Sequence, residues 1–537
     1  MKRRNVIKAM TLLPLADGVL PFKSVVGAPT NDITEGKKVE PNIFRSIGVE
    51  PVINCMGTFT IIGGSLERPP VRAAMEAASK NFIQYDELAE GIGRRMAQLT
   101  GAEWGMVSAG CAAGLKHVTA ACVTGGNPEK LIRIPDLTGF DKTEVVIPVT
   151  SRNAYDHAIR NIGVKVIDVR TMNELEQAIN PQTAMIYVLS GSREPFTVSA
   201  IAKVAKAKNV PLLVDAAAED LTVPNIHLQN GATVVAYSGG KALCGPQCAG
   251  ILLGQKDLLQ SAWQASSPHH GPGRDNKVGR EEMMGALAAV EAWISHDHKA
   301  QWKTWLSYLD TISQKVTKIN GVTTRVHEPE GYDNHSPVLL VMWDPDKLHI
   351  TGEEVAEELG RNKPRIALAA GWGNKDDMTS IRITAGQMQP GEDKIVADRI
   401  AEVLSRKRSP RSKTMAAPAA SIAGKWDIEI AFYSSKSQYS WILEQEDNWL
   451  QGSHTGELSQ TRSMNGTIEG DQVKIRTTTA IPGDHVTFLY TGALSGDQIT
   501  GSVYMVEYGT AKFTAKKNKK KADRRKINVP GGPPLAT

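Results

Sequence analysis

Apolar runs of strand length alternate with amphipathic stretches over residues 43–300 of the 537-residue chain. The runs at 144–150, 164–169, 184–189 and 211–215 are rich in Val, Ile and Leu, and helical patterns lie between most of them. Continuous apolar runs are typical of strands buried on both faces, and their alternation with helices is typical of a parallel sheet. The pattern therefore predicts a large α/β domain built on a mostly parallel sheet.

Residues 301–407 show a second pattern, which predicts a smaller α+β subdomain. Long helical stretches stand near its two ends, and shorter strand-like runs lie between them. The expected elements are helices at 299–319 and 392–405 and strands at 323–326, 338–343 and 380–384. A linker that contains Pro and Ala, at 408–421, follows this subdomain.

Strict alternation of apolar and polar residues sets in at residue 422 and continues to 516. Asn, Asp and Gly turns separate about eight short runs, which predicts a small all-β domain of the up-and-down barrel or sandwich type. Trp426, close after Gly424, resembles the first strand of small lipocalin-like domains. The expected strands are 424–430, 439–446, 449–455, 464–469, 472–478, 486–494, 498–504 and 509–516.

Charge and cysteine content exclude several classes of protein. The net charge is +5, but residues 516–526 hold eight Lys or Arg and one Asp, which leaves the rest of the chain at −2. A nucleic-acid-binding body is therefore not indicated, and 517–537 is expected to be a disordered basic tail. The five cysteines are too few and too scattered for a disulfide framework, and no metal site is predicted.

The N-terminus carries paired arginines, Arg3 and Arg4, then a modest apolar run and small residues near 26–28. This order resembles a twin-arginine export signal over residues 1–28, followed by a polar linker at 29–42. The apolar run is too short for a membrane span, and no other span is predicted. A periplasmic or secreted protein is therefore expected, with an amphipathic N-terminal tail as the alternative.

Two reactive side chains follow neighbouring apolar runs. Asp215 ends the run 211–215, and Lys241 stands in the small-residue turn after the run 234–237. Pyridoxal phosphate (PLP) chemistry needs this pair, because a lysine forms the Schiff base and an aspartate keeps the ring nitrogen protonated. The turn and helix start at 108–113 could hold a phosphate, and the polar stretch 152–157 follows another strand. All four features are expected at one edge of the sheet, where α/β proteins bind ligands.

These motifs resemble fold-type-I PLP-dependent enzymes, and within them the branch of bacterial selenocysteine synthase (seryl-tRNA selenium transferase) and D-glucosaminate-6-phosphate ammonia-lyase. The resemblance covers residues 43–407 and implies an aspartate aminotransferase-like fold and a homodimer or larger assembly. The segments that carry it are Gly48-Val-Glu-Pro-Val-Ile-Asn54, Leu99-Thr-Gly-Ala-Glu103, Val107-Ser-Ala-Gly-Cys-Ala-Ala113, Ser151-Arg152, Val214-Asp215-Ala216-Ala217, Ser238-Gly-Gly-Lys241 and Lys277-Val-Gly-Arg-Glu-Glu282.

The resemblance also implies a role for each matching residue. Lys241 would be the Schiff-base lysine and proton carrier, and Asp215, ionised beside a cation, would pair with the pyridine nitrogen. Arg382 would bind the substrate carboxylate. The cofactor phosphate would be held by Ser108, Gly110, Cys111 and Ala112, with the Ser238 hydroxyl in addition. Arg152 or His157 would contact the cofactor ring or the substrate. Arg274 and Lys277 would bind phosphate or substrate, in one arrangement from the other subunit across a dimer interface.

Three functions remain open from the sequence. The favoured one is a PLP-dependent lyase that removes the α-proton of an amino acid or amino sugar acid and then eliminates a group. A selenium transferase acting on seryl-tRNA is the alternative, although the export signal does not suit a cytoplasmic tRNA and no dedicated tRNA-binding domain is visible. The third is an exported binding protein that retains the PLP-enzyme fold without catalysis.

Overall fold

The computed structural model describes residues 42–371, 378–410, 414–457 and 461–518. The expected signal at 1–28, the linker up to residue 41 and the basic tail from residue 519 lie outside the described residues. The described residues up to Pro51 belong to a unit of their own, in which an ion pair of 2.8 Å between Arg45 and Glu50 accompanies the 3-10 turn Arg45–Ile47.

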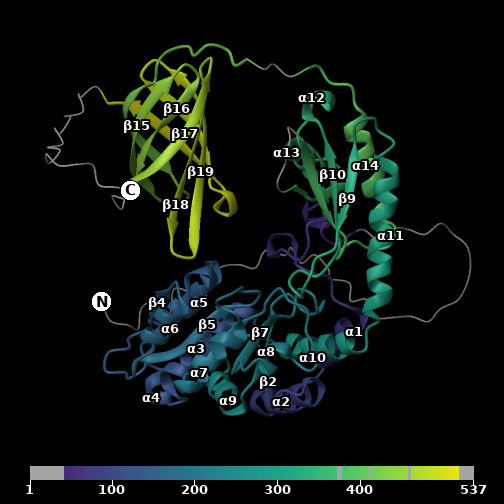
Figure 1. Cartoon of the computed structure of the whole chain (residues 1–537), viewed down its shortest axis with the longest axis vertical. Coiled ribbons are helices and arrows are strands. Elements are labelled where there is room, and N and C mark those ends of the chain that lie inside the picture. Colours follow the sequence, from purple (N-terminus) through teal and green to yellow (C-terminus); the bar gives the residue numbers. More distant parts are fainter. Residues whose placement is uncertain (1–41, 372–377, 411–413, 458–460, 519–537) are drawn as a thin grey trace, which may run out of the picture. The chain divides into compact units, whose positions relative to one another are not determined.

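A seven-stranded sheet organises the large α/β part of the second unit (Figure 1). Its strand order is β2-β8-β7-β6-β5-β3-β4, and β8 alone runs antiparallel to both of its neighbours. The other six strands therefore end at the same edge, which confirms the mostly parallel sheet. The bounds are β2 Trp104–Ala109, β3 Glu144–Pro148, β4 Lys165–Val169, β5 Thr183–Leu189, β6 Leu212–Asp215, β7 Val234–Ser238 and β8 Ala249–Gly254.

Helices join these strands and share one apolar core with them. The helix α3 is buried on almost every side and follows β2 directly, so its first turn lies at the edge where the parallel strands end. The sequence did not predict α9 or the short helices α4 and α8. The helices are α1 Pro69–Ser79, α2 Tyr85–Thr100, α3 Cys111–Thr124, α4 Pro128–Leu131, α5 His157–Arg160, α6 Met172–Ala178, α7 Val198–Ala207, α8 Ile226–Gln229, α9 Lys256–Gln264 and α10 Arg280–Ile294.

The α+β subdomain has a second core around a four-stranded sheet of order β12-β13-β10-β9. The segment Gly48–Asn54 contains the strand β1 (Val52–Asn54), which joins this core rather than the large sheet, because it pairs in parallel with β11. The other elements are β9 Thr323–His327, β10 Val338–Trp343, β11 Arg365–Ala367, β12 Ala369–Ala370, β13 Thr379–Thr384, α11 His298–Val316, α12 Pro345–Leu348, α13 Gly352–Arg361 and α14 Glu392–Ser405.

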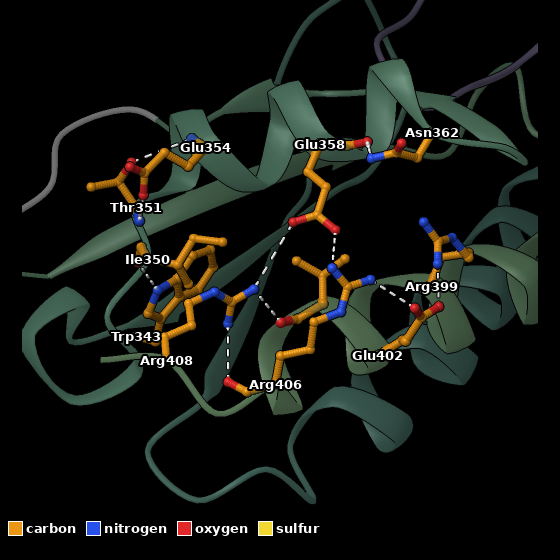
Figure 2. A network of polar contacts seen from close by, with 11 residues as sticks. Trp343, Ile350, Thr351, Glu354, Glu358, Asn362, Arg399, Glu402, Arg406 and Arg408 are labelled. Carbon is orange, nitrogen blue, oxygen red and sulfur yellow. Dashed lines mark hydrogen bonds and ion pairs between the residues drawn. The ribbon is translucent and has the colours of Figure 1, made fainter. Parts of the chain in front are cut away.

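Figure 2 shows the ion pairs and hydrogen bonds that join α13 to the end of α14. Glu358 on α13 accepts a hydrogen bond from Arg406 and lies 4.0 Å from Arg408, while Arg406 also donates to Glu402 over 2.7 Å. Arg408 donates to the carbonyl of Val403, also over 2.7 Å. These partly exposed ion pairs set the direction in which the chain leaves α14 and contribute little to stability individually.

The C-terminal domain is a closed eight-stranded antiparallel barrel with its own core, as the alternating pattern predicted (Figure 1). Each of the eight expected runs is a strand. Their bounds are β14 Gly424–Ala431, β15 Lys436–Glu446, β16 Trp449–Thr455, β17 Thr461–Glu469, β18 Gln472–Ile481, β19 Asp484–Ser495, β20 Gln498–Tyr504 and β21 Thr510–Lys517.

Within the described ranges, no helix combines the length and the apolar character needed to cross a lipid bilayer.

A buried histidine stands inside this barrel. His454 is only 1% exposed, its Nε2 lies 3.2 Å from the Tyr490 hydroxyl, and its ring stacks on that of Tyr439 at 5.2 Å. Burial lowers the pKa of His454 to about 4, so the ring is neutral in the folded barrel at neutral pH.

The barrel should therefore lose stability as the pH falls. An unfolded histidine has a pKa of about 6.5, so protonation favours the unfolded state below that pH, by up to ~3 kcal/mol as pH 4 is approached. Hydrogen-exchange protection factors of peptides from β16 and β19 should fall between these pH values. His454→Phe should flatten the dependence and His485→Gln, at an exposed position of β19, should not; equal slopes for His454→Phe and the parent would contradict this account.

Candidate active site

Asp215 and Lys241 lie on neighbouring strands. Asp215 is the last residue of β6 and is in register with Ala236 of β7, and Lys241 stands in the turn after β7, where its N–H donates to the Ser238 carbonyl over 3.3 Å. A Cβ on Gly240 would lie 2.4 Å from the Cα of Gln247, so only glycine lets this turn pack against the chain there. The local sequence thus fixes where the lysine emerges.

The Asp215 carboxylate is buried among neutral donors. Tyr187 donates its hydroxyl to Oδ2 over 2.9 Å, the Ala217 N–H donates to Oδ1 over 3.1 Å, and the Cys111 thiol approaches Oδ1 at 3.7 Å. Asn153 in turn donates to the Tyr187 hydroxyl over 3.0 Å. Among the described residues, no Lys, Arg or His makes an ion pair with this carboxylate.

The surroundings of the Asp215 carboxylate suit a positively charged ligand. Burial raises the pKa of Asp215, while the Tyr187 hydrogen bond, the Ala217 N–H and the charge of Lys241 act in the opposite direction. Burial also raises the pKa of Cys111 and of Tyr187, so both stay protonated and can donate. A positive group placed against Asp215 would favour its ionised form.

The start of α3 offers an anion site at the same edge. Gly110, the residue before the helix, has φ 86° and no side chain that caps it, so the first N–H groups, from Cys111 onward, are available to a ligand. Ser108 is buried and donates its hydroxyl to the Gly110 carbonyl over 2.9 Å, so its hydroxyl shapes the turn. Cys111 thus belongs both to the anion site and to the surroundings of Asp215.

These three features fit PLP. Lys241 supplies an amine, Asp215 is a buried carboxylate whose partners are neutral, and the α3 N-terminus provides N–H donors for a phosphate. The residues that would hold the cofactor are therefore Lys241, Asp215 and the first turn of α3. Within the described residues, no group of His, Cys, Asp and Glu is arranged to hold a metal ion.

A cavity of about 670 Å³ opens beside Lys241. Its volume is that of a small-molecule site. Arg382, on β13 of the subdomain, lies in its wall together with Lys241, so a lysine and an arginine line the same space, and the expected binding of a substrate carboxylate by Arg382 stays a prediction. Aromatic side chains form much of the remaining wall, namely Trp293, Trp302, Trp305, Tyr155 and Tyr332.

Four other expected site residues lie elsewhere. Arg152 forms ion pairs of 2.5 Å with Asp156 and 2.6 Å with Asp168, and His157 is exposed at the start of α5. Arg274 and Lys277 are exposed in the loop before α10 and do not line the cavity. Their expected action across a subunit interface stays a prediction.

The remaining expected residues belong to the turns already described. Ala112 lies in the first turn of α3, and the partly buried Ser238 ends β7 beside the lysine turn.

Sequence reasoning missed Tyr187 and Asn153. Tyr187 is a lone polar-tipped residue inside the apolar strand β5, which pairs with β6, and this anomaly was the available signal. The stretch 151–157 was correctly placed at the edge of the sheet, but Asn153, not Arg152, connects to the Asp215 group. The pair of Asp220 and His335 in the cavity wall was missed as well.

Comparison with known proteins points the same way. The model of the Cys/Met metabolism PLP-dependent enzyme family matches residues 88–295. D-glucosaminate-6-phosphate ammonia lyase from Salmonella typhimurium is 31% identical over 309 residues, which cover 54% of this chain and 79% of that protein. A solved structure of D-glucosaminate-6-phosphate ammonia-lyase superimposes with a TM-score of 0.61 at 26% identity, over 68% of this chain and 98% of the other.

More distant relatives differ in their chemistry. A 5'-C-glycyluridine monooxygenase-decarboxylase from a Streptomyces species is 26% identical over 67% of this chain and 92% of that protein. An L-seryl-tRNA(Sec) selenium transferase from Moorella thermoacetica is 25% identical over 55% of this chain and 68% of that protein.

The family match over residues 88–295 lies outside the barrel and includes the lysine, the buried aspartate and the helix start. This chain belongs to the fold-type-I PLP-dependent enzymes, in the branch that includes D-glucosaminate-6-phosphate ammonia lyase and the seryl-tRNA selenium transferases.

Proposed function

We propose that this PLP-dependent enzyme is a lyase that removes the α-proton of an amino acid or amino sugar acid, eliminates a group from the neighbouring carbon and releases ammonia. The observation that carries the proposal is the placement of Lys241 and Arg382 in the wall of one cavity of small-molecule size. Similarity to an ammonia lyase supports it.

Each residue has a distinct task in this reaction. The Arg382 guanidinium binds the substrate carboxylate and so orients the α-carbon toward Lys241. Lys241 Nζ takes the α-proton, and Asp215 holds a proton on the ring nitrogen of the cofactor. PLP, when bound, supplies the electron sink for the pair that the α-proton leaves behind.

The aromatic wall suits a substrate with a carbon skeleton beyond the reacting carbons. Trp302 and Trp305 line the cavity, and their ring centroids lie 6.0 Å apart. Such rings exclude water and contact the apolar faces of a sugar-acid chain or an amino-acid side chain.

Replacement of Lys241 tests the proposal directly. Purified Lys241→Ala should lack the visible absorbance of lysine-bound PLP and should release ammonia at least about 10²–10⁴-fold more slowly in a screen of amino acids and amino sugar acids. Lys206→Ala, at an exposed position on α7, is the matched control and should behave like the parent. Undiminished ammonia release by Lys241→Ala would rule out the mechanism.

Tyr187 should set the pH at which the enzyme becomes active. Its hydroxyl lowers the pKa of Asp215, so Tyr187→Phe should raise that pKa and leave less ionised carboxylate at a given pH. Loss of a hydrogen bond to a charged group costs about 1.5–3 kcal/mol, so the acidic limb of kcat/KM should move up by about 1–2 pH units.

The control for this shift is Tyr433→Phe, since Tyr433 is 97% exposed on the barrel. An unmoved acidic limb in Tyr187→Phe would show that the hydroxyl does not act on Asp215 during the reaction.

We also propose that the folded enzyme is exported, on the strength of the paired Arg3 and Arg4 and the apolar run behind them. Because the twin-arginine route carries folded proteins, PLP could be inserted before export. Replacement of both arginines by lysine should retain the protein in the cytoplasm, as immunoblots of periplasmic and cytoplasmic fractions would show. Equal periplasmic amounts of parent and variant would contradict this route.

A further inference from the structure

An aspartate and a histidine form a second polar pair in the wall of the Lys241 cavity. His335 Nδ1 lies 2.8 Å from Asp220 Oδ2, and both residues line the cavity. Burial raises the pKa of Asp220 and the His335 hydrogen bond acts against it; when the carboxylate is ionised it can only accept this hydrogen bond, and Nδ1 then carries the donated proton. Nε2 is then the nitrogen that can exchange a proton, and no hydrogen bond occupies it within the described part of the chain.

The His335 ring, bonded to Asp220 through one nitrogen, also packs against an indole ring. It stacks on Trp302 at a centroid distance of 4.6 Å and an angle of 32°, and the indole N–H of Trp302 donates to Glu328 over 2.8 Å. A ring oriented by a carboxylate on one nitrogen and packed against an indole is preorganised for proton transfer through the other nitrogen.

Backbone hydrogen bonds join the histidine loop to the segment that carries Asp215. The Asp220 N–H donates to the Tyr332 carbonyl and the Asn334 N–H donates to the Ala218 carbonyl, each over 2.9 Å. Asp220 follows Asp215 by five residues. The pair is thus positioned by the same stretch of chain as the carboxylate that faces the cofactor.

The loop that carries His335 lines the same cavity as the lysine. Asp333 and His335 lie in the cavity wall together with Lys241, so the loop presents a proton-transfer group to the space that Lys241 also lines. Burial and Glu219 raise the pKa of Asp333, while the Asn334 hydrogen bond and the charge of Lys241 lower it.

We propose that His335, oriented by Asp220, is the acid that protonates the group leaving the β-carbon. The inference rests on the proposed lyase function and deepens it. Hydroxide leaves carbon poorly unless it is protonated, whereas halide leaves without help, so an acid in the wall of the Lys241 cavity should matter for a hydroxyl leaving group and not for a halide.

With serine as the substrate, the step balances as follows. Lys241 Nζ takes the α-proton, the electron pair forms the double bond between the α- and β-carbons, and the β-carbon–oxygen bond breaks. The oxygen takes the Nε2 proton of the His335 imidazolium, whose Nδ1–H stays bonded to Asp220, and leaves as water. The unsaturated amino acid gains a proton at its β-carbon, one water adds at its α-carbon, and ammonia leaves. The net change converts a 3-hydroxy amino acid into a 2-keto acid and ammonia, and His335 regains its proton from solvent.

A pair of probes that differ only in the leaving group tests this role. Both enantiomers of serine and of β-chloroalanine are offered to the PLP-loaded full chain, and ammonia release is followed together with exchange of the α-proton in deuterated water. His335→Gln should release ammonia from serine about 10²–10⁴-fold more slowly than the parent. It should retain α-proton exchange and near-parental elimination from β-chloroalanine.

Asp220 acts through His335, so its variants should show the same selectivity in milder form. Asp220→Asn should slow serine more than β-chloroalanine, and Asp220→Glu should restore part of the loss. Calorimetric binding of serine against alanine gives a readout independent of turnover, and the preference of the parent for the hydroxyl should shrink in His335→Gln. The control is His485→Gln, an exposed barrel residue.

The possible outcomes separate the two proposals. If His335→Gln slows serine and β-chloroalanine equally, or slows neither, His335 is not the acid, while the lyase function stands. If the parent exchanges no α-proton in any probe, the lyase function fails and the role of His335 fails with it.

Discussion

The rest of the active site depends on one buried carboxylate. Asp215 lies in the interior at the end of β6, where an unpaired charge is costly, and the chain surrounds it with neutral donors rather than with a basic side chain. No basic side chain of the described residues would have to be displaced for a positively charged group to pair with this carboxylate. Tyr187, Asn153 and Cys111 come from three other places in the chain, and all three belong to the hydrogen-bond network around it.

The chain that follows Asp215 also connects the large sheet to the subdomain. The chain continues from Asp215 into the segment that bonds to the 332–334 loop, so the carboxylate, the Asp220 and His335 pair and the cavity wall are tied together by backbone hydrogen bonds. Arg382 reaches the cavity from a different strand of the subdomain. Lys241 and Arg382 therefore come from parts of the chain with separate cores, and the cavity lies where both parts contribute.

Local signals in the sequence predicted what depends on local chemistry. Apolar runs and small-residue turns are enough to place Asp215, Lys241 and the start of α3, and strict alternation is enough for all eight barrel strands. What the sequence missed depends on long-range contact: Tyr187 is 28 residues from Asp215, and His335 is 115 residues from Asp220. The helix α13 was missed although its capping box, Thr351 with Glu354, was a readable local signal.

Arg152 shows the opposite case, in which a residue stands out in the sequence but pairs with other side chains of the protein. Its position after β3 drew attention to it, yet Asp156, one helical turn further on, and Asp168 on the neighbouring strand neutralise it. A basic residue at the edge of a sheet carries information about a ligand only when the nearby carboxylates have been accounted for.

The position of Cys111 bears on the length of ligand that can bind here. It is the first residue of the helix whose N-terminus offers the anion site, and its side chain touches the carboxylate of Asp215. A single residue therefore contacts the carboxylate and begins the helix that offers the N–H donors. Because β2, β6 and the buried α3 hold that residue in place, the fold sets the distance between these two features, and a molecule that binds both must match that distance in length.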